Sequence, residues 1–316
     1  MDLSLPSRAF WAARFRPPEP DELLRTLAAE ARELRALGAA LVELPGDLPA
    51  VSAAHSSPGF WSRVADVLAD EELGATVHLP FAWVDLTALD REVWEGSVRS
   101  VEAAMAAVRP LAPRMVAVHP ANYATRAVVD WAPPAERPAL TMALGSRLVE
   151  ALRRLRGAPG GEVLALENLE GLPAEVFTIV VEAAGVGVCL DVGHAVAEGQ
   201  DPVALVAAWR ERLVGLHLHD AVRSRAGGDA ARSAGGGATR GAGDETSDPA
   251  EALFESAHMS LGTGVLDLDR LVAALVAAAF DGPVVIEVIG EHETSTRRYL
   301  ECLARHRPRG RPGGCG

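Results

Sequence analysis

Short apolar runs alternate with longer amphipathic stretches along most of this chain. The apolar runs predict eight β-strands, at residues 8–14, 39–44, 75–79, 114–119, 162–167, 186–191, 213–219 and 283–288. The amphipathic stretches predict helices near residues 20–37, 60–72, 90–109, 139–156, 173–184, 201–211, 267–279 and 294–305. Strands that alternate with helices are typical of a parallel sheet. Eight such repeats predict a closed (β/α)8 barrel. An open doubly wound sheet is the alternative, although no GxGxxG motif follows an early strand.

One segment interrupts this alternation. Residues 223–250 are rich in Gly, Ala, Ser and Arg and have no apolar period, which predicts a disordered insertion in the loop after the seventh strand. A flexible lid is the alternative, because long loops in compact domains are often functional. The last residues, 306–316, are also predicted to be disordered. The remainder, residues 1–305, is predicted to form a single barrel domain.

The charged residues exclude several kinds of chemistry. All 30 basic residues are arginines, so a lysine Schiff base, an amine nucleophile and a P-loop lysine are excluded. The formal net charge of −13 disfavours non-specific binding to nucleic-acid phosphates. Bound metal ions can still reverse the sign of the charge inside a cleft. We therefore expect a small-molecule substrate rather than a nucleic acid.

Cysteine usage and hydropathy predict a cytoplasmic protein. The three cysteines, Cys189, Cys302 and Cys315, form no CxxC pair, and reduced thiols are the simplest interpretation. The first residues lack the apolar core of a signal peptide. The most apolar run, residues 271–280, is about half the length of a membrane span. We therefore expect no membrane segment.

Side chains that can bind metal ions stand at the ends of six consecutive predicted strands. They are His78, His119, Glu167, Asp191 with His194, His217 with His219, and Glu287. The carboxyl ends of barrel strands meet at one face, and barrel enzymes build their active sites there. Imidazole and carboxylate ligands without thiolates suit Zn, Mn, Fe or Co, and the pattern does not choose among these metals.

Several of these residues also have an ordinary structural explanation. A lone histidine at a strand end, such as His78, is more often a hydrogen-bonded core residue than a ligand. Glu167 and Glu287 follow apolar runs, where a buried carboxylate needs a cation. In a chain without lysine, that cation is an arginine or a metal ion. His217 and His219 share one face of a strand, so one of them can serve only to support a ligand.

The remaining histidines are His194, which stands close to Asp191 in the sequence, and three histidines outside the strand ends. Asp191 and His194 stand three residues apart, and a turn carboxylate followed by a helix start explains that spacing as well as a metal site does. The histidines outside the strand ends are predicted to lie on the surface: His55, His292 and His306.

A glycine-containing segment, HMSLGTG, follows the predicted insertion. His258 stands four residues before Gly262, and Gly264 completes the motif. Glycines let the backbone approach a ligand closely, and the loops after the seventh and eighth strands often bind phosphate in barrels. A plain tight turn is the alternative. Arginines in loops or at strand ends are candidates for contacting the same phosphate: Arg14, Arg126 and Arg223.

These motifs resemble a known superfamily. Residues 8–222 and 256–303 resemble the xylose-isomerase-like TIM barrels, and the segment LGAALVELPG around Glu43 looks like the second strand of that superfamily. The superfamily includes sugar isomerases and epimerases as well as the phosphodiesterases of AP endonuclease family 2. The isomerase branch implies one metal ion held by four residues, with Glu167 and Glu287 also acting as acid and base. The four are Glu167, Asp191, His217 and Glu287.

The phosphodiesterase branch implies the same four ligands and additional histidines that hold a metal cluster. The positions that match are His78, His119, His194 and His258. In this interpretation Glu167 bridges two ions, while His194 and His258 hold a third ion or donate directly to the phosphate. Endonuclease-IV-type enzymes have an aspartate two residues before the last histidine, whereas this chain has Ser256, which leaves a third ion open.

Within the phosphodiesterase branch, three motifs are most similar to the cobamide-remodelling phosphodiesterases: VCLDVGH, LHLHDAV and HMSLGTG. This resemblance implies hydrolysis of the nucleotide-loop phosphodiester of cobamides with two, or at most three, divalent ions. It also implies that Glu167, Glu287 and His258 are catalytic and that His219, Gly262 and Gly264 contact the substrate. A single-metal sugar isomerase or epimerase is the alternative. A barrel that only binds a ligand is the third.

Overall fold

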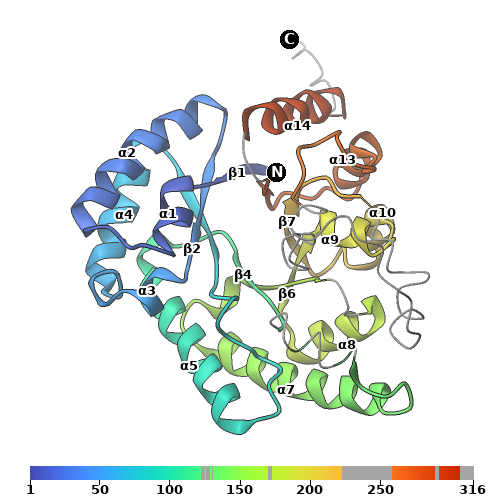
Figure 1. Ribbon diagram of the computed structural model, residues 1–316. Helices are drawn as coiled ribbons and strands as arrows, with labels where there is room; N and C mark the ends of the chain where they lie inside the picture. Colours follow the sequence, from blue (N-terminus) through green and yellow to red (C-terminus); the bar gives the residue numbers. More distant parts are fainter. Residues whose placement is uncertain are drawn as a thin grey trace, which may run out of the picture.

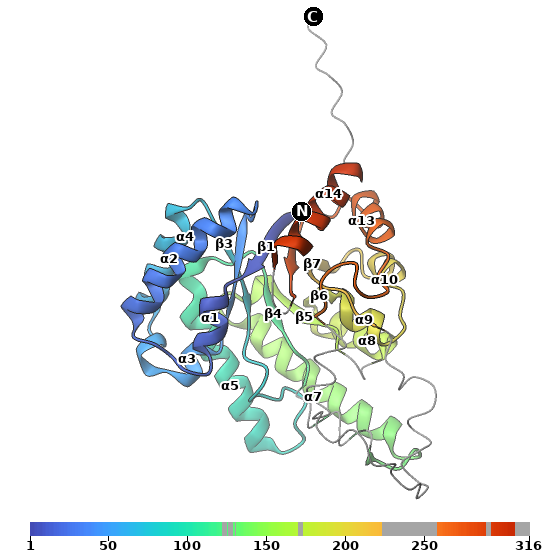
Figure 2. The same ribbon diagram turned by 45° about the horizontal axis from the view of Figure 1, so that its top comes forward.

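Eight parallel strands close into a barrel with helices on the outside in the computed structural model (Figure 1, Figure 2). The structure describes residues 1–121, 125, 129, 131–169, 173–222, 258–288 and 292–306. Consecutive strands pair in chain order, and the first pairs with the last. The strands are β1 (Asp2–Pro6), β2 (Leu41–Pro45), β3 (Gly74–His78), β4 (Val116–Val118), β5 (Leu164–Glu167), β6 (Gly187–Asp191), β7 (Leu213–Leu218) and β8 (Pro283–Ile286). This closure confirms the predicted (β/α)8 barrel and excludes the open sheet.

The first strand lies earlier in the chain than predicted. Residues 8–14, predicted as a strand, instead contain the helix α1 (Arg8–Ala13). The Oγ atom of Ser7 accepts a hydrogen bond from the Phe10 N–H and donates one to Glu30. A serine in this position caps a helix by satisfying a backbone donor of the first turn. The prediction failed because a short apolar run has the same pattern in a buried strand and in a buried helix.

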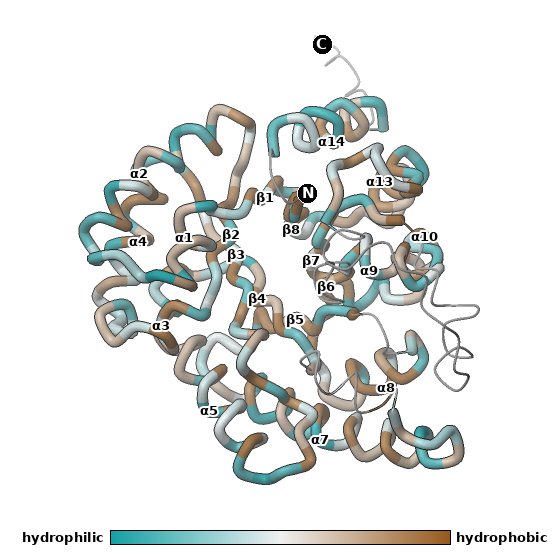
Figure 3. Tube along the Cα trace, viewed as in Figure 1, coloured by the Kyte–Doolittle hydropathy of each residue, from teal (hydrophilic) through white to brown (hydrophobic). Residues whose placement is uncertain are grey.

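Helices cover the outside of the barrel, and each buries one apolar face. In α2 (Pro20–Ala36) the buried side chains include Leu23, Leu27 and Leu34, at successive intervals of four and seven positions, which is the spacing of one helix face. Figure 3 shows the resulting alternation of hydrophilic and hydrophobic residues along the outer helices. The other longer helices are α4 (Pro58–Asp70), α5 (Arg91–Val108), α7 (Arg137–Gly157), α8 (Ala174–Ala184), α13 (Leu268–Ala277) and α14 (His292–His306). Shorter ones are α3 (Leu48–Val51), η1 (Ala53–His55), η2 (Arg109–Leu111), η3 (Gly161–Val163), α9 (Val192–Ala197) and α10 (Pro202–Ala208).

Inward-facing side chains form layers inside the barrel. One layer is small, apolar and fully buried, and it consists of Met115, Ala117, Ala165, Cys189 and Val285. Successive side chains of a strand point to opposite faces, so the residue two positions further along also points inward. The positions two residues after four members of this layer are His119, Glu167, Asp191 and Glu287. The strand pleat therefore places polar groups directly above an apolar layer, at the carboxyl end of the barrel.

Two histidines predicted to lie on the surface are buried instead. His55 is only 1% exposed, and its ring packs edge-on against Phe60 with 4.8 Å between the centroids. Its Nδ1 atom lies 2.7 Å from the Oγ of Ser52. His292 is also buried, at the start of α14. A neutral imidazole can be buried with one hydrogen bond and a ring contact, so its neighbours in sequence need not show an apolar pattern. His306 ends α14 and is partly exposed.

Some predictions fall on residues that the structure does not describe. The predicted insertion, residues 223–250, and the tail after His306 lie outside the described residues. The same holds for Arg126, Arg223, Ser256 and Cys315. Both cysteines of the described part, Cys189 and Cys302, are free and buried. Among the described helices, none is long and apolar enough to span a membrane.

Candidate metal centre

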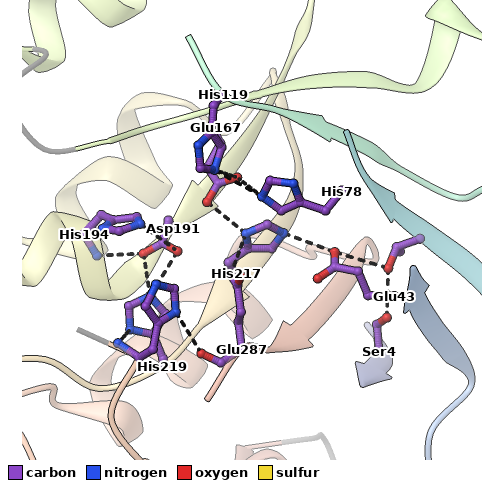
Figure 4. A network of polar contacts seen from close by, with 12 residues as sticks. Ser4, Glu43, His78, His119, Glu167, Asp191, His194, His217, His219 and Glu287 are labelled. Carbon is purple, nitrogen blue, oxygen red and sulfur yellow. Dashed lines mark hydrogen bonds and ion pairs between the residues drawn. The ribbon is translucent and has the colours of Figure 1, made fainter. Parts of the chain in front are cut away.

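Six strand ends bring imidazoles and carboxylates together at the carboxyl end of the barrel (Figure 4). One group of three lies around an oxygen of Glu167. The Nε2 atoms of His78 and His119 lie 3.5 Å and 3.3 Å from Oε2 of Glu167 and 3.1 Å from each other. The three side chains place one potential ligand atom each within 4.8 Å of one another. They can therefore hold one metal ion between them.

A second group uses the other oxygen of the same glutamate. The Nδ1 atom of His217 lies 2.9 Å from Oε1 of Glu167 and 3.0 Å from Oε2 of Glu287. Asp191 completes this group, in which the four potential ligand atoms again lie within 4.8 Å of one another. Because Glu167 belongs to both groups, its carboxylate is placed to bridge two ions.

A third group of histidines lies on the other side of Asp191. Asp191 caps α9, with its Oδ1 atom accepting a hydrogen bond from the His194 N–H at 2.6 Å. The Nε2 atom of His219 lies 3.0 Å from the same carboxylate. The ring of His258 stacks on that of His219, with 4.2 Å between the centroids, and lies 5.6 Å from that of His194. His219 thus contacts both Asp191 and His258, which agrees with a supporting role as well as with a ligand role.

The chemistry of these side chains fits a divalent cation. Glu167 and Asp191 are fully buried, and the Oε2 atoms of Glu167 and Glu287 have no hydrogen-bond partner within the described part of the chain. The ion pairs that these carboxylates form with described residues are all with histidines. Buried carboxylates without a fixed cation are costly. A metal ion would remove that cost, and the donor set of imidazole and carboxylate suits Zn, Mn, Fe or Co.

The close packing of these groups shifts their pKa values in opposite directions. Burial lowers the pKa of His78, but its close contact with Glu167 and the charge of that carboxylate outweigh burial and raise the pKa to about 9. Burial raises the pKa of Glu167, but the charges of His217 and His119 outweigh it and hold the pKa well below its ordinary value. Burial lowers the pKa of His258, and His219 lowers it further. The carboxylate of Glu167 is therefore ionised at neutral pH, as a metal ligand must be, whereas a metal ion would have to displace a proton from His78.

A family model described as "Xylose isomerase-like TIM barrel" matches residues 31–306. This chain belongs to that family. The match covers most of the barrel, including every strand that contributes to the three groups above. It confirms the resemblance at the level of the superfamily, whose members are enzymes. The closer resemblance to cobamide-remodelling phosphodiesterases is not tested by this match.

Solved structures agree with this assignment of the xylose isomerase-like barrel. A D-tagatose 3-epimerase-like protein is 16% identical with a TM-score of 0.66, covering 96% of this chain and 99% of the other. An L-ribulose 3-epimerase is 16% identical with a TM-score of 0.66, covering 98% and 99%. A 3-keto-D-glucoside 4-epimerase from E. coli is 16% identical with a TM-score of 0.64, covering 97% and 99%. At these identities the likeness shows the fold alone. The search of curated proteins gave no match.

Glu43 is a buried carboxylate of this xylose isomerase-like barrel that is not among the metal ligands predicted from the sequence. Glu43 in β2 is fully buried, and its Oε1 atom lies 3.3 Å from Nε2 of His217. The Oγ1 atom of Thr76 lies 3.5 Å from the same oxygen and 2.9 Å from Oγ of Ser4. Glu43 thus contacts the nitrogen of His217 that faces away from the other carboxylates. The signal that could have found it is an acidic residue inside the apolar run LVELP.

Asp220 holds the segment HMSLGTG, residues 258–264, in place through hydrogen bonds. The Oδ2 atom of Asp220 accepts a hydrogen bond from the Gly262 N–H at 2.7 Å, and Oδ1 accepts one from the Leu266 N–H. A Cβ atom at Gly264 would collide with the Asp220 carboxylate and the Ala221 carbonyl. The backbone donor of Gly262 is therefore already used within the protein. Phosphate contacts by Gly262 and Gly264 remain a prediction.

Proposed function

We propose that this chain is a divalent-metal-dependent phosphodiester hydrolase with two ions in its centre. The observation that carries the proposal is the convergence of His78 and His119 on the Oε2 atom of Glu167. A one-metal enzyme needs only the group that contains His217. Two further imidazoles, on the opposite oxygen of Glu167, would not be metal ligands in that case. They match the needs of a second ion.

The residues can be divided between two ions, although His78 also lies within reach of His217 and Glu287. His78 and His119 would hold one ion, and Asp191, His217 and Glu287 would hold the other. Glu167 would contact both. Divalent ions in such a pair lower the pKa of a bound water and stabilise charge on the oxygens of a phosphodiester. His194 and His258 lie beyond Asp191, where we propose that they contact the phosphate or hold a further ion.

We further propose the nucleotide-loop phosphodiester of cobamides as the substrate. The support for this substrate is the sequence of the motifs VCLDVGH, LHLHDAV and HMSLGTG. The net charge of −13 agrees with a small molecule better than with a nucleic acid, because an acidic surface repels phosphate backbones.

The fold comparisons favour a second candidate, a single-metal sugar isomerase or epimerase, since the similar structures named above are epimerases or resemble one. Glu167 and Glu287 both contact Nδ1 of His217. The two carboxylates therefore lie close together at the carboxyl end of the barrel. Such a pair can remove a proton from the carbon beside a carbonyl and return it. In this candidate His78 and His119 would contact the substrate or stabilise the barrel.

Counting ions and assaying both reactions distinguishes the two candidates. We would purify the protein without chelators, measure metal per chain by mass spectrometry and compare wild type with His119→Asn. The first proposal expects at least two equivalents in wild type, the loss of one in the variant, and hydrolysis of bis(p-nitrophenyl) phosphate and of a cobamide. One equivalent in both proteins, together with ketose epimerisation, would overturn it in favour of the second candidate.

A further inference from the structure

One arginine is buried close to the candidate metal centre with part of its hydrogen-bonding edge unused. Arg14 follows α1, and its side chain is 10% exposed. Its Nε atom lies 3.4 Å from Oδ2 of Asp47. The Nη1 atom is buried and has no hydrogen-bond partner within the described part of the chain. Buried donors in folded proteins are nearly always hydrogen-bonded. The unpaired Nη1 of Arg14 is therefore placed to donate to an acceptor from outside the chain.

Aromatic rings fix the plane of this guanidinium. The Cζ atom of Arg14 lies 4.3 Å from the ring centroid of Trp11 and 4.9 Å from that of Phe81. Stacking occupies the faces of a guanidinium and leaves its N–H edge for the oxygens of an anion. Trp11 adds a second donor, because its Nε1 atom is also buried and has no hydrogen-bond partner among the described residues. Two donors that lack acceptors therefore lie on adjacent side chains.

The same rings contact the metal-binding histidines. The centroid of Trp11 lies 5.9 Å from that of His78. Phe81 lies 4.9 Å from His78 and 4.7 Å from His119. Burial lowers the pKa of Arg14, while the charges of Asp47 and Glu287 act in the opposite direction, so Arg14 lies within electrostatic reach of the centre. The unused donors therefore adjoin the end of the centre that contains His78 and His119.

We propose that Arg14 and Trp11 form an anion-binding subsite that takes a phosphate oxygen of the substrate. Arg14 donates through Nη1, Trp11 donates through Nε1, and Asp47 orients the guanidinium from its Nε end. The inference rests on the proposed function, because the bound anion is the phosphate of that substrate. It adds a residue that selects for phosphate and is not a metal ligand. An anionic oxygen accepts from these two donors more strongly than a neutral sugar hydroxyl does.

Inorganic phosphate is a probe that needs no turnover. We would measure its dissociation constant by titration calorimetry on the metal-loaded full chain, comparing wild type with Arg14→Met. The matched control is Arg16→Met, which removes the same charge at an exposed position two residues away. We expect phosphate to bind at least about tenfold more weakly to the Arg14 variant, the usual scale for losing a charge-assisted contact. The control should stay within about twofold.

Two further variants separate a subsite from a purely structural ion pair. Trp11→Phe keeps an aromatic ring beside Arg14, although a smaller one, and removes the Nε1 donor, so phosphate should bind several-fold more weakly. Asp47→Asn keeps an oxygen that can accept from the Arg14 Nε–H, and so keeps the orientation, but removes a negative charge beside the subsite. Phosphate should therefore bind more tightly to this variant. All variants are compared at equal metal content.

The possible outcomes distinguish this inference from the proposed function. Weaker phosphate binding by the Arg14 variant in a protein that hydrolyses no phosphodiester would keep the subsite and reject the hydrolase. Unchanged phosphate affinity in a variant with a lower melting temperature would show that Arg14 only stabilises the fold, and would overturn the inference whatever the enzyme does.

Discussion

The Oε2 atom of Glu167 lies 3.3 Å from Nε2 of His119, while the Oε1 atom of the same carboxylate faces His217. One carboxylate thus connects two imidazoles that precede it in the chain, those of His78 and His119, with one that follows it, that of His217. Glu167 ends β5, in the middle of the run of strands that contribute potential ligands. Its central place makes it the residue on which both candidate ion sites depend.

Replacing Glu167 with Gln should therefore abolish both sites together. The amide keeps the size of the side chain but lacks the negative charge that an ion or a neighbouring imidazolium requires. We expect neither equivalent of metal to remain and turnover to fall at least about a hundredfold. Metal analysis and a phosphodiester assay measure the two effects. Glu175→Gln, at an exposed position of α8, is the control. Near-wild-type activity in the Glu167 variant would show that the centre is assigned wrongly.

Glu43 is expected to support metal binding without touching the metal. Its carboxylate contacts Nε2 of His217, and a carboxylate on the outer nitrogen of a ligating imidazole fixes the ring and raises its basicity. The Glu43→Gln variant should bind its ions about 10- to 100-fold more weakly while keeping the same number of sites. Competition with a chromophoric chelator gives the affinity. An unchanged affinity would mean that Glu43 only fills the barrel.

Gly193 is required because the ring of His219 occupies the place of its side chain. A Cβ atom at this position would collide with that ring. We expect Gly193→Ala to destabilise the fold by about 1–3 kcal/mol, as overpacking usually does, and to disturb the contact between His219 and Asp191. Gly145→Ala in α7 is the matched control, since its Cβ would meet only Val180 at 3.8 Å. That change should stabilise the helix by about 0.5–1 kcal/mol. Urea unfolding of both variants checks the contrast, and equal effects would contradict it.

His55 should make the fold sensitive to mild acid. Burial lowers the pKa of its imidazole below the ordinary value. The unfolded chain therefore binds a proton below pH of about 6.5 that the folded state does not bind, so this histidine's contribution to stability is present above that pH and is lost as the pH falls. His55→Gln should flatten the dependence of unfolding free energy on pH between 7.5 and 5.5, by at most about 1.4 kcal/mol per pH unit. Urea unfolding with a chelator present measures both slopes. Identical slopes would exclude this role.

The sequence by itself determined the repeat and most of its boundaries. Seven predicted strands overlap the observed ones, because short apolar runs between amphipathic helices have few other stable arrangements. It also determined which residues end those strands, since the inward direction follows from the two-residue period alone. The first strand was misplaced where the capping interaction of Ser7 with Phe10, rather than hydrophobicity, decided the conformation.

Only the tertiary structure decided which polar side chains lie close to one another. His78 and His119 are 41 positions apart, and no spacing rule says that they approach the same oxygen of Glu167. That proximity depends on closure of the barrel and on the register of neighbouring strands. The same is true of Glu43 behind His217, and of Arg14 between Trp11 and Phe81. Patterns along a chain report which face a side chain takes, whereas distances between side chains are set by packing, which joins segments that are remote in sequence.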